Sequence, residues 1–258
     1  MAGTRVLDGK IALVTGAGTG LGKASALALA AEGAGVVVTE LPDRLDRAEA
    51  TIAEVRAAGG DGVALPLNVL DLAQIGRCVE DAAAFGGRID ILVNNAGLNV
   101  PKRAFEVTEA DWDAVLDVNL KGVFFVAQAV GRVMRDQSPQ GGCVINMASQ
   151  MGLVGYYDRA AYCSSKAGVV NLTRVLAIEW AEFGIRANAV CPTFVETPLT
   201  RPMFEKSEAF REDVLNRILL HRLATPEEIA AAVVFLASPG AAMVNGHPLP
   251  VDGGWTAI

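Results

Sequence analysis

A tyrosine and a lysine four residues apart are the side chains in this sequence best suited to chemistry. They are Tyr162 and Lys166, within the stretch from Ala160 to Gly168. If this stretch is helical, residues i and i+4 share one face, and the phenol and the ammonium group become neighbours. A free tyrosine has a pKa near ~10, and a nearby cation stabilises the phenolate and lowers that pKa. The pair predicts a tuned acid/base, although the same spacing also occurs in exposed helical pairs without a chemical role.

A glycine-rich stretch near the N-terminus has the composition of a phosphate-binding turn. Residues 14–22 read Val-Thr-Gly-Ala-Gly-Thr-Gly-Leu-Gly, between an apolar run and an Ala/Leu-rich helical segment. Glycines let the backbone approach a pyrophosphate closely, and the following helix N-terminus offers free N–H groups. A strand before and a helix after are the context of a dinucleotide-binding loop; the alternative is a purely structural turn. We expect cofactor contacts from Gly16, Gly18, Thr19, Gly20, Leu21 and Gly22.

An acidic residue bears on which dinucleotide is bound. Glu40 ends the second predicted strand, about two dozen residues after Gly16, the distance at which an acid binds the adenosine ribose hydroxyls. A carboxylate there repels a 2′-phosphate, so NAD is expected rather than NADP. Thr19 agrees, because the glycine loop carries no basic side chain. Arg44 and Arg47 lie close downstream and keep NADP as the alternative.

The elements that must position these residues alternate between short apolar runs and helices. Strands are predicted at residues 11–14, 36–39, 63–67, 89–93, 143–147 and 187–191, and helices at 21–32, 45–58, 71–85, 108–134 and 162–183. Such alternation favours a parallel sheet with helices on both faces, which right-handed crossovers turn into a doubly wound, Rossmann-type α/β fold. No linker or repeat interrupts the chain, so one domain over residues 1–258 is expected.

Residues 193–225 break this alternation. Prolines flank a mixed segment that reads as one or two short helices inserted between two strands. An insertion after the carboxyl end of a strand lies where doubly wound sheets bind their ligands. The hypothesis is a lid over the substrate, and the alternative is an ordinary surface excursion.

Composition and charge argue against several functional classes. The chain has 22 basic and 29 acidic residues, a net charge of −7 and no basic run, so nucleic acid is not an expected partner. Its four cysteines and two histidines form no C-x-x-C or metal-ligand spacing, so neither a metal site nor a disulfide framework is expected. The sequence shows no signal-peptide pattern and no apolar run long enough to span a bilayer. We therefore expect a soluble, cytoplasmic protein.

Several motifs together resemble the classical branch of the short-chain dehydrogenase/reductase family. The glycine loop follows its T-G-x-x-x-G-x-G spacing, residues 94–97 its N-N-A-G, and Tyr162 with Lys166 its Y-x-x-x-K. Asn119 and Ser149 match its helix asparagine and its catalytic serine. Weaker matches cover residues 192–197 and 251–254, in family order across nearly the whole chain.

This resemblance implies a catalytic set of Asn119, Ser149, Tyr162 and Lys166. Tyr162 would pass a proton to or from the substrate oxygen, which Ser149 would hold by a hydrogen bond. Lys166 would lower the pKa of Tyr162 and bind the nicotinamide ribose, and Asn119 would anchor a water in the proton relay. The implied reaction interconverts a secondary alcohol and its ketone by hydride transfer. Read singly, Ser149 fits a strand-end cap and Asn119 a buried polar group of a helix.

The resemblance also implies further cofactor contacts, and three positions depart from the family pattern. Asn68 stands where aspartate is common, yet its oxygen can accept from the adenine amine. Thr193 replaces a glycine and loses the freedom to adopt a positive φ. Asn245 replaces a frequent threonine. Asn95, like Asn94, either contacts the cofactor or only joins neighbouring strands. The implied contacts are Asn68, Val69, Asn95, Ala96, Gly97, Pro192, Thr193, Val195 and Thr197, besides Tyr162 and Lys166.

The expected substrate side combines polar and apolar side chains. No arginine cluster indicates a phosphate or a carrier-protein partner. A small or medium secondary alcohol therefore fits, such as a polyol, sugar acid or cyclic alcohol, with alcohol oxidation as the expected direction. The alternatives are an NADP-linked ketone or 3-oxoacyl reductase, and a non-catalytic NAD(H)-sensing regulator. The expected pocket residues are Gln150, Met151, Tyr156, Tyr157, Phe194, Leu199 and Phe204.

Partners are expected to be copies of the chain itself. The predicted helices at 108–134 and 162–183 carry apolar residues around much of their circumference. One sheet face does not cover so much apolar surface, and subunit contacts commonly bury the excess. Because the resembled family is frequently tetrameric, a homotetramer is expected.

Overall fold

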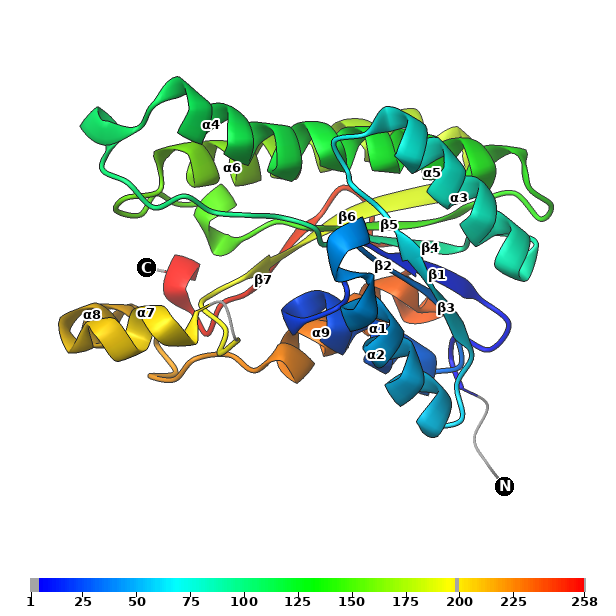
Figure 1. Ribbon diagram of the computed structural model, residues 1–258, viewed down its shortest axis with the longest axis horizontal. Coiled ribbons are helices and arrows are strands. Elements are labelled where there is room, and N and C mark those ends of the chain that lie inside the picture. Colours follow the sequence, from blue (N-terminus) through cyan, green and yellow to red (C-terminus); the bar gives the residue numbers. More distant parts are fainter. Residues whose placement is uncertain (1–4, 198–199, 258) are drawn as a thin grey trace.

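A parallel β-sheet forms the middle layer of the molecule in a computed structural model that describes residues 5–197 and 200–257 (Figure 1). Its order is β3-β2-β1-β4-β5-β6-β7, and every neighbouring pair is parallel. This arrangement confirms the doubly wound Rossmann-type fold. The strands are β1 (Ile11–Val14), β2 (Gly35–Glu40), β3 (Gly62–Pro66), β4 (Ile91–Asn94), β5 (Gly142–Met147), β6 (Ile185–Pro192) and β7 (Pro248–Val251).

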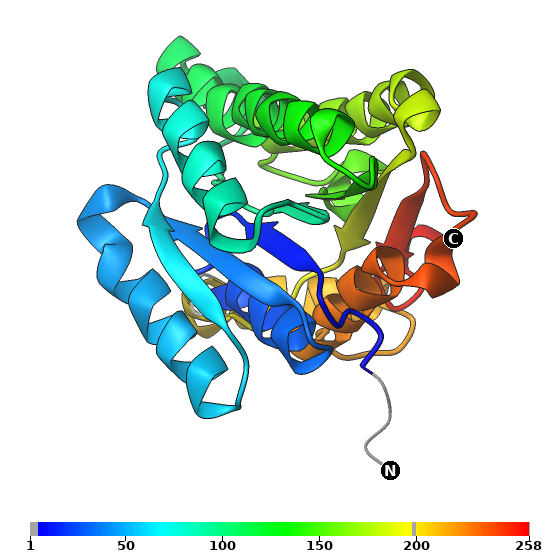
Figure 2. The ribbon, with the colours of Figure 1, turned by 90° about the vertical axis from the view of Figure 1, so that its right-hand side faces the viewer.

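Helices cover both faces of the sheet because its strands are apolar on both sides. Along β2, Val36 and Val38 belong to the core under one helix layer, whereas Val37 belongs to the core under the other. The first layer contains α1 (Gly20–Ala31), α2 (Leu45–Ala57) and α9 (Pro226–Ala237) (Figures 1 and 2). The second contains α3 (Leu72–Gly86), α4 (Glu109–Leu116), α5 (Val123–Asp136) and α6 (Ala160–Glu179).

Local sequence sets several helix starts. The Asp71 side chain accepts a hydrogen bond from the Gln74 backbone at 3.0 Å and forms the N-cap of α3. Thr108 and Asp111 form a capping box at the start of α4. Such caps satisfy backbone donors that the first helical turn leaves unpaired.

The long helix predicted from Thr108 is interrupted. A six-residue π-helix, Asp117–Gly122, separates α4 from α5 and contains the buried Asn119. π-turns widen a helix locally and concentrate at functional sites. The hydrophobic periodicity of the sequence did not predict this π-helix.

The helical run Glu109–Asp136 corrects the expectation that no apolar segment is long enough to span a bilayer. By length and composition it would suffice to cross a membrane. Its apolar residues Val126, Val130 and Met134 are instead fully buried against the sheet. These apolar residues of the run therefore form part of the protein core.

Helices α7, α8 and α9 (Pro226–Ala237) and strand β7 follow β6 and complete the fold. The predicted insertion forms two short helices, α7 (Arg201–Lys206) and α8 (Glu208–Arg217), beyond the carboxyl ends of the strands (Figure 1). Helix α9 and strand β7 were not predicted. Pro248 and Pro250 disguise β7, and proline is tolerated there because β7 is an edge strand.

Candidate active site

The carboxyl ends of β1, β4, β5 and β6 surround a cavity of about 500 Å³. The strand order reverses between β1 and β4, and such a switch point is where doubly wound sheets bind ligands. The predicted residues that line the cavity are Thr19, Gly20, Leu21, Asn95, Gly97, Ser149, Gln150, Met151, Tyr162, Lys166, Pro192, Thr193, Phe194, Val195 and Thr197.

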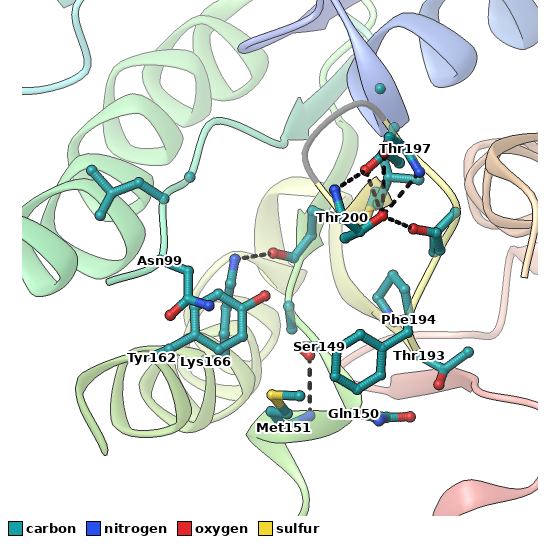
Figure 3. A pocket seen from close by; sticks show the side chains of 18 of the residues that line it. Asn99, Ser149, Gln150, Met151, Tyr162, Lys166, Thr193, Phe194, Thr197 and Thr200 are labelled. Carbon is teal, nitrogen blue, oxygen red and sulfur yellow. Dashed lines mark hydrogen bonds between the residues drawn. The ribbon is translucent and has the colours of Figure 1, made fainter. Parts of the chain in front are cut away.

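Helix α6 brings the predicted tyrosine and lysine together, as their spacing indicated. The Lys166 Nζ lies 5.7 Å from the centroid of the Tyr162 ring and donates to the Met147 carbonyl oxygen at 2.7 Å. Ser149 follows β5, and its hydroxyl accepts a hydrogen bond from the Met151 backbone at 3.1 Å on the same cavity that Tyr162 lines. Figure 3 shows these side chains at one wall of the cavity.

Burial dominates the proton affinities of this pair. It raises the pKa of Tyr162, while the nearby Ser149 hydroxyl and the positive charge of Arg159 lower it. Burial also lowers the pKa of Lys166 to about 8. The expectation that Lys166 brings down the pKa of Tyr162 is therefore not met in this structure, where burial outweighs the charges and the opposing cation is Arg159.

Asn119 lies behind the cavity wall and all its amide atoms have protein partners. Its Nδ2 donates to the Leu98 carbonyl at 2.8 Å and to the Ser165 hydroxyl at 3.2 Å, and its Oδ1 accepts from the Leu98 backbone at 2.8 Å. A Cβ atom added to Gly97 would lie 3.1 Å from Asn119 Oδ1 and 3.7 Å from Lys166 Nζ. Asn119 thus holds the backbone beside Lys166, and its role in a water relay stays a prediction.

The glycine loop has the geometry of a phosphate cradle. Gly16 and Gly20 adopt φ values of +61° and +57°, a left-handed region that favours glycine. Thr19 is the N-cap of α1, but its side chain accepts no hydrogen bond from the helix, so it leaves the first N–H groups uncapped. A Cβ atom on Gly18 would lie 2.9 Å from Glu40 Oε2, so the carboxylate sits directly over the loop. These residues fit a dinucleotide.

The asparagines at the end of β4, Asn94 and Asn95, join neighbouring strands. Asn95 Nδ2 donates to the carbonyl oxygens of Thr15 at 3.0 Å and Gly16 at 2.9 Å. Asn94 Nδ2 donates to Asn146 Oδ1 on β5 at 3.0 Å. The structural role is therefore present for both, and Asn95 additionally lines the cavity.

The remaining predicted cofactor residues lie outside the cavity. The Asn68 oxygen accepts a hydrogen bond from the Leu70 backbone at 3.0 Å, so it is already engaged in a local turn. Val69 packs against Gly122 of the π-helix, and Ala96 against Gly16. The predicted cofactor residues absent from the described cavity lining are Gly16, Gly18, Gly22, Glu40, Asn68, Val69 and Ala96.

Two departures from the family pattern have structural explanations. Thr193 is not among the positive-φ residues, so its backbone does not require glycine. Its buried hydroxyl has no partner in the described part of the chain, which fits a polar group of a ligand. Asn245 accepts from the Ala187 backbone at 2.9 Å and donates to the Ala177 carbonyl at 3.1 Å, so it ties β6 to α6.

The predicted substrate pocket needs correction. Gln150, Met151 and Phe194 line the cavity, but Tyr156, Tyr157 and Phe204 are absent from its described lining. Leu199 lies outside the described residues.

The three misplaced aromatic residues have different surroundings. The Tyr156 hydroxyl donates to Asp213 of α8 at 2.7 Å. Phe204 of α7 packs against Phe194, with ring centroids 6.0 Å apart. The Tyr157 side chain is 71% exposed. Tyr156 and Phe204 therefore hold the insertion against the body of the protein, and Tyr157 faces solvent.

Sequence reasoning missed part of the wall. Leu98, Asn99, Pro101, Arg159 and Thr200 also line the cavity. Arg159 had a readable signal, because it lies only three residues before Tyr162, at the start of the same helix. In the described residues, no group of three metal-ligating side chains was found.

Comparison with known proteins decides the family. A profile described as Enoyl-(Acyl carrier protein) reductase matches residues 16–256. D-threitol dehydrogenase from Mycolicibacterium smegmatis is 43% identical over 97% of this chain and 94% of its own length. The chain belongs to the classical short-chain dehydrogenase/reductase family. Members of this family act on CH–OH groups as oxidoreductases, and the fold and motifs of this chain agree with that membership.

Two further family members differ in their named substrates. The 3-oxoacyl-(acyl-carrier-protein) reductase FabG from Thermotoga maritima is 42% identical over 96% of this chain and 98% of its own. A solved structure described as a 2-deoxy-D-gluconate 3-dehydrogenase from Agrobacterium tumefaciens, with bound NADP, is 40% identical, has a TM-score of 0.89, and is covered over 99% of this chain and 100% of its own. Family membership therefore establishes a nicotinamide-dependent oxidoreductase.

Proposed function

We propose that this short-chain dehydrogenase/reductase interconverts a secondary alcohol and its ketone with NAD. The observation that carries the proposal is the convergence of Ser149, Tyr162 and Lys166 on the cavity that the glycine loop also lines. Neutral hydrogen-bond donors there face a space large enough for a small substrate beside a nicotinamide.

Each residue of the proposed set has a distinct task. The Tyr162 hydroxyl exchanges a proton with the substrate oxygen, and the Ser149 hydroxyl fixes that oxygen by a hydrogen bond. Lys166 binds the nicotinamide ribose, with Met147 orienting its amine. Asn119 keeps the wall beside Lys166 in place. A bound nicotinamide supplies or accepts the hydride, which no side chain can do.

For the substrate we propose a polyol, sugar acid or cyclic alcohol. A D-threitol dehydrogenase and a 2-deoxy-D-gluconate 3-dehydrogenase among the relatives support this class. A second candidate is an NADP-linked 3-oxoacyl reductase, favoured by the relative FabG. Substrates of that kind carry a long pantetheine arm with phosphate, for which the described cavity wall offers few cations.

The insertion at residues 193–225 is proposed as the substrate lid. Met151 and Phe194 line the cavity and pack in one apolar cluster with Phe204 and Val214 of the insertion. Thr193, Val195, Thr197 and Thr200 of the insertion also line the cavity. The insertion therefore forms part of the wall, and its displacement would open one side of the cavity.

Assembly as a cytoplasmic homotetramer is part of the proposal. Helices α4 and α6 pack against each other, and they expose Trp112, Val175 and Ile178, the last being 78% exposed. Apolar surface of this kind is typical of subunit contacts. Analytical ultracentrifugation should give four times the chain mass, and a monomer at micromolar concentration would refute this point.

Turnover measurements test the proposed reaction directly. Purified protein is supplied with NAD or NADP and a panel of alditols, aldonates, cyclic alcohols and a 3-oxoacyl thioester, while reduced nicotinamide absorbance is followed. We expect turnover with at least one secondary alcohol. Tight binding of NADH without turnover of any compound would favour the sensing regulator.

Replacing Glu40 tests the cofactor choice. We expect Glu40→Ala to shift the ratio of kcat/KM for NAD over NADP by about tenfold toward NADP, since a charge repelling the 2′-phosphate is removed. Arg47→Ala is the matched control, because the Arg47 Cβ also lies against Gly18. If only Arg47→Ala changes the ratio, this arginine rather than Glu40 governs the preference.

A further inference from the structure

Arg159 is a buried cation in the cavity wall that neither the cofactor cradle nor the proposed proton transfer uses. Its exposed fraction is 5%, and it lines the cavity beside Tyr162. Arginine is almost never buried this deeply unless acceptors or an anion replace the water it loses. The question is therefore what compensates this charge.

Protein groups satisfy little of the guanidinium. Of its five N–H donors, one is used within the described residues: Nη1 donates to the Asp158 carbonyl oxygen at 3.0 Å. Across residues 5–197 and 200–257, no carboxylate oxygen lies within 4.0 Å of it. The carboxylate of Asp158 approaches the exposed Arg103 instead, at 3.8 Å. Within the described residues, no carboxylate therefore forms a direct ion pair with this guanidinium.

The local backbone places Arg159 at a position where a positive charge is electrostatically unfavourable. Asp158 adopts a φ of +58°, an uncommon conformation for a residue other than glycine. Arg159 then forms the N-cap of the 20-residue helix α6. A cation at a helix N-terminus adds to the partial positive charge already there. A bound anion would offset both contributions.

Resting on the proposed function, we propose that Arg159 binds a carboxylate of the substrate, so that the enzyme acts on hydroxy acids and their oxo acids in preference to neutral polyols. Arg159 is the N-cap of α6, three residues before Tyr162 and seven before Lys166, and all three side chains line the same cavity. The first two differ by about 4.5 Å along the helix axis. A carboxylate on Arg159 therefore lies only a few bonds from a carbinol group at Tyr162.

The wall around Arg159 favours a carboxylate over a phosphate. A guanidinium fork pairs with the two oxygens of one carboxylate in a bidentate manner. Leu98, Pro101, Met151 and Phe194 supply apolar surface, and Lys166 is the only other basic side chain in the described lining. Because Lys166 is directed to Met147, one cation remains for the substrate, which matches a monoanion.

Paired substrates and paired variants test this assignment. Aldonates of four to six carbons are compared with alditols of the same length, using wild type, Arg159→Met, Arg159→Lys and the control Arg103→Met. We expect wild type to prefer aldonates. Arg159→Met should lower the aldonate-to-alditol ratio of kcat/KM by about 100-fold, Arg159→Lys should restore part of it, and Arg103→Met should leave it unchanged.

A binding measurement separates this inference from the proposed reaction. Aldonates are titrated calorimetrically into protein saturated with NADH, and Arg159→Met should abolish the binding that wild type shows, whether or not turnover occurs. A wild-type preference for alditols, or absence of aldonate binding, overturns the inference while leaving the alcohol dehydrogenase proposal standing if alditols react. Equal loss for both substrate types, with a shifted pH profile, would show that Arg159 acts on Tyr162 and overturns it too.

Discussion

Tyr162→Phe should lower kcat by about 1000-fold, because it removes the one proton that the reaction exchanges with the substrate oxygen. The ring itself remains, so its packing in the wall and beside Lys166 is kept. NADH binding, followed by fluorescence, should stay within a few-fold of wild type. Steady-state kinetics with the best alcohol of the panel measures the loss.

Tyr157→Phe is the matched control for this substitution. Its side chain is 71% exposed and outside the described cavity lining, so its hydroxyl should be dispensable. If Tyr162→Phe keeps activity within a few-fold of wild type, the proton comes from another group. Equal losses in both variants would indicate a general effect of tyrosine removal.

Lys166→Met should reduce kcat/KM by about 1000-fold, with a clear rise in the KM for NAD. The substitution removes charge-assisted hydrogen bonds to the ribose, each contributing about 1.5–3 kcal/mol. It also frees the Met147 carbonyl, which accepts from Lys166 at 2.7 Å. A loss confined to kcat, with NAD affinity unchanged, would contradict the ribose-binding role.

The Lys166→Met variant should also show how much the burial of this lysine lowers the free energy of unfolding. In the folded state the pKa of Lys166 is lowered from 10.5 to about 8. This shift corresponds to a destabilisation of the folded state by about 3 kcal/mol at neutral pH. Below pH 8 both states carry the proton; between about 8 and 10.5 only the unfolded chain keeps it. The free energy of unfolding of wild type should therefore rise relative to Lys166→Met across that window.

Urea unfolding at several pH values measures this difference. The exposed Lys121 provides the control, because Lys121→Met should show no comparable trend. A difference between wild type and Lys166→Met that stays constant from pH 7 to 10.5 would mean that the buried amine titrates as it does in the unfolded chain.

The sequence predicted the parts of the fold and site that depend on local spacing. The pairing of Tyr162 with Lys166 needed only a helix, and the glycine loop needed only a strand before it and a helix after it. Strand β7 was missed because Pro248 and Pro250 contradict strand propensity, and only its edge position makes them tolerable. The π-helix left no mark in the hydrophobic periodicity.

Side-chain direction in loops depends on tertiary contacts, which spacing does not reveal. Tyr156 and Tyr157 are adjacent in sequence, yet one bonds to Asp213 and the other faces solvent. The burial of Arg159, about which the sequence analysis made no prediction, follows from contacts with distant segments, including a β-bridge to Lys102. The balance of burial and charge at Tyr162 likewise required the packed structure.

The π-helix around Asn119 limits which changes of sequence and length this helix can accept. A π-turn accommodates one more residue than an α-turn between the same two ends. Deleting a single amino acid there would restore regular α-helical winding between the same two ends, and the local bulge that positions Asn119 would be lost. Asn119 would then lose its two hydrogen bonds to the backbone N–H and carbonyl groups of Leu98. This helix should therefore accept many exchanges on its outer surface but no change in its length.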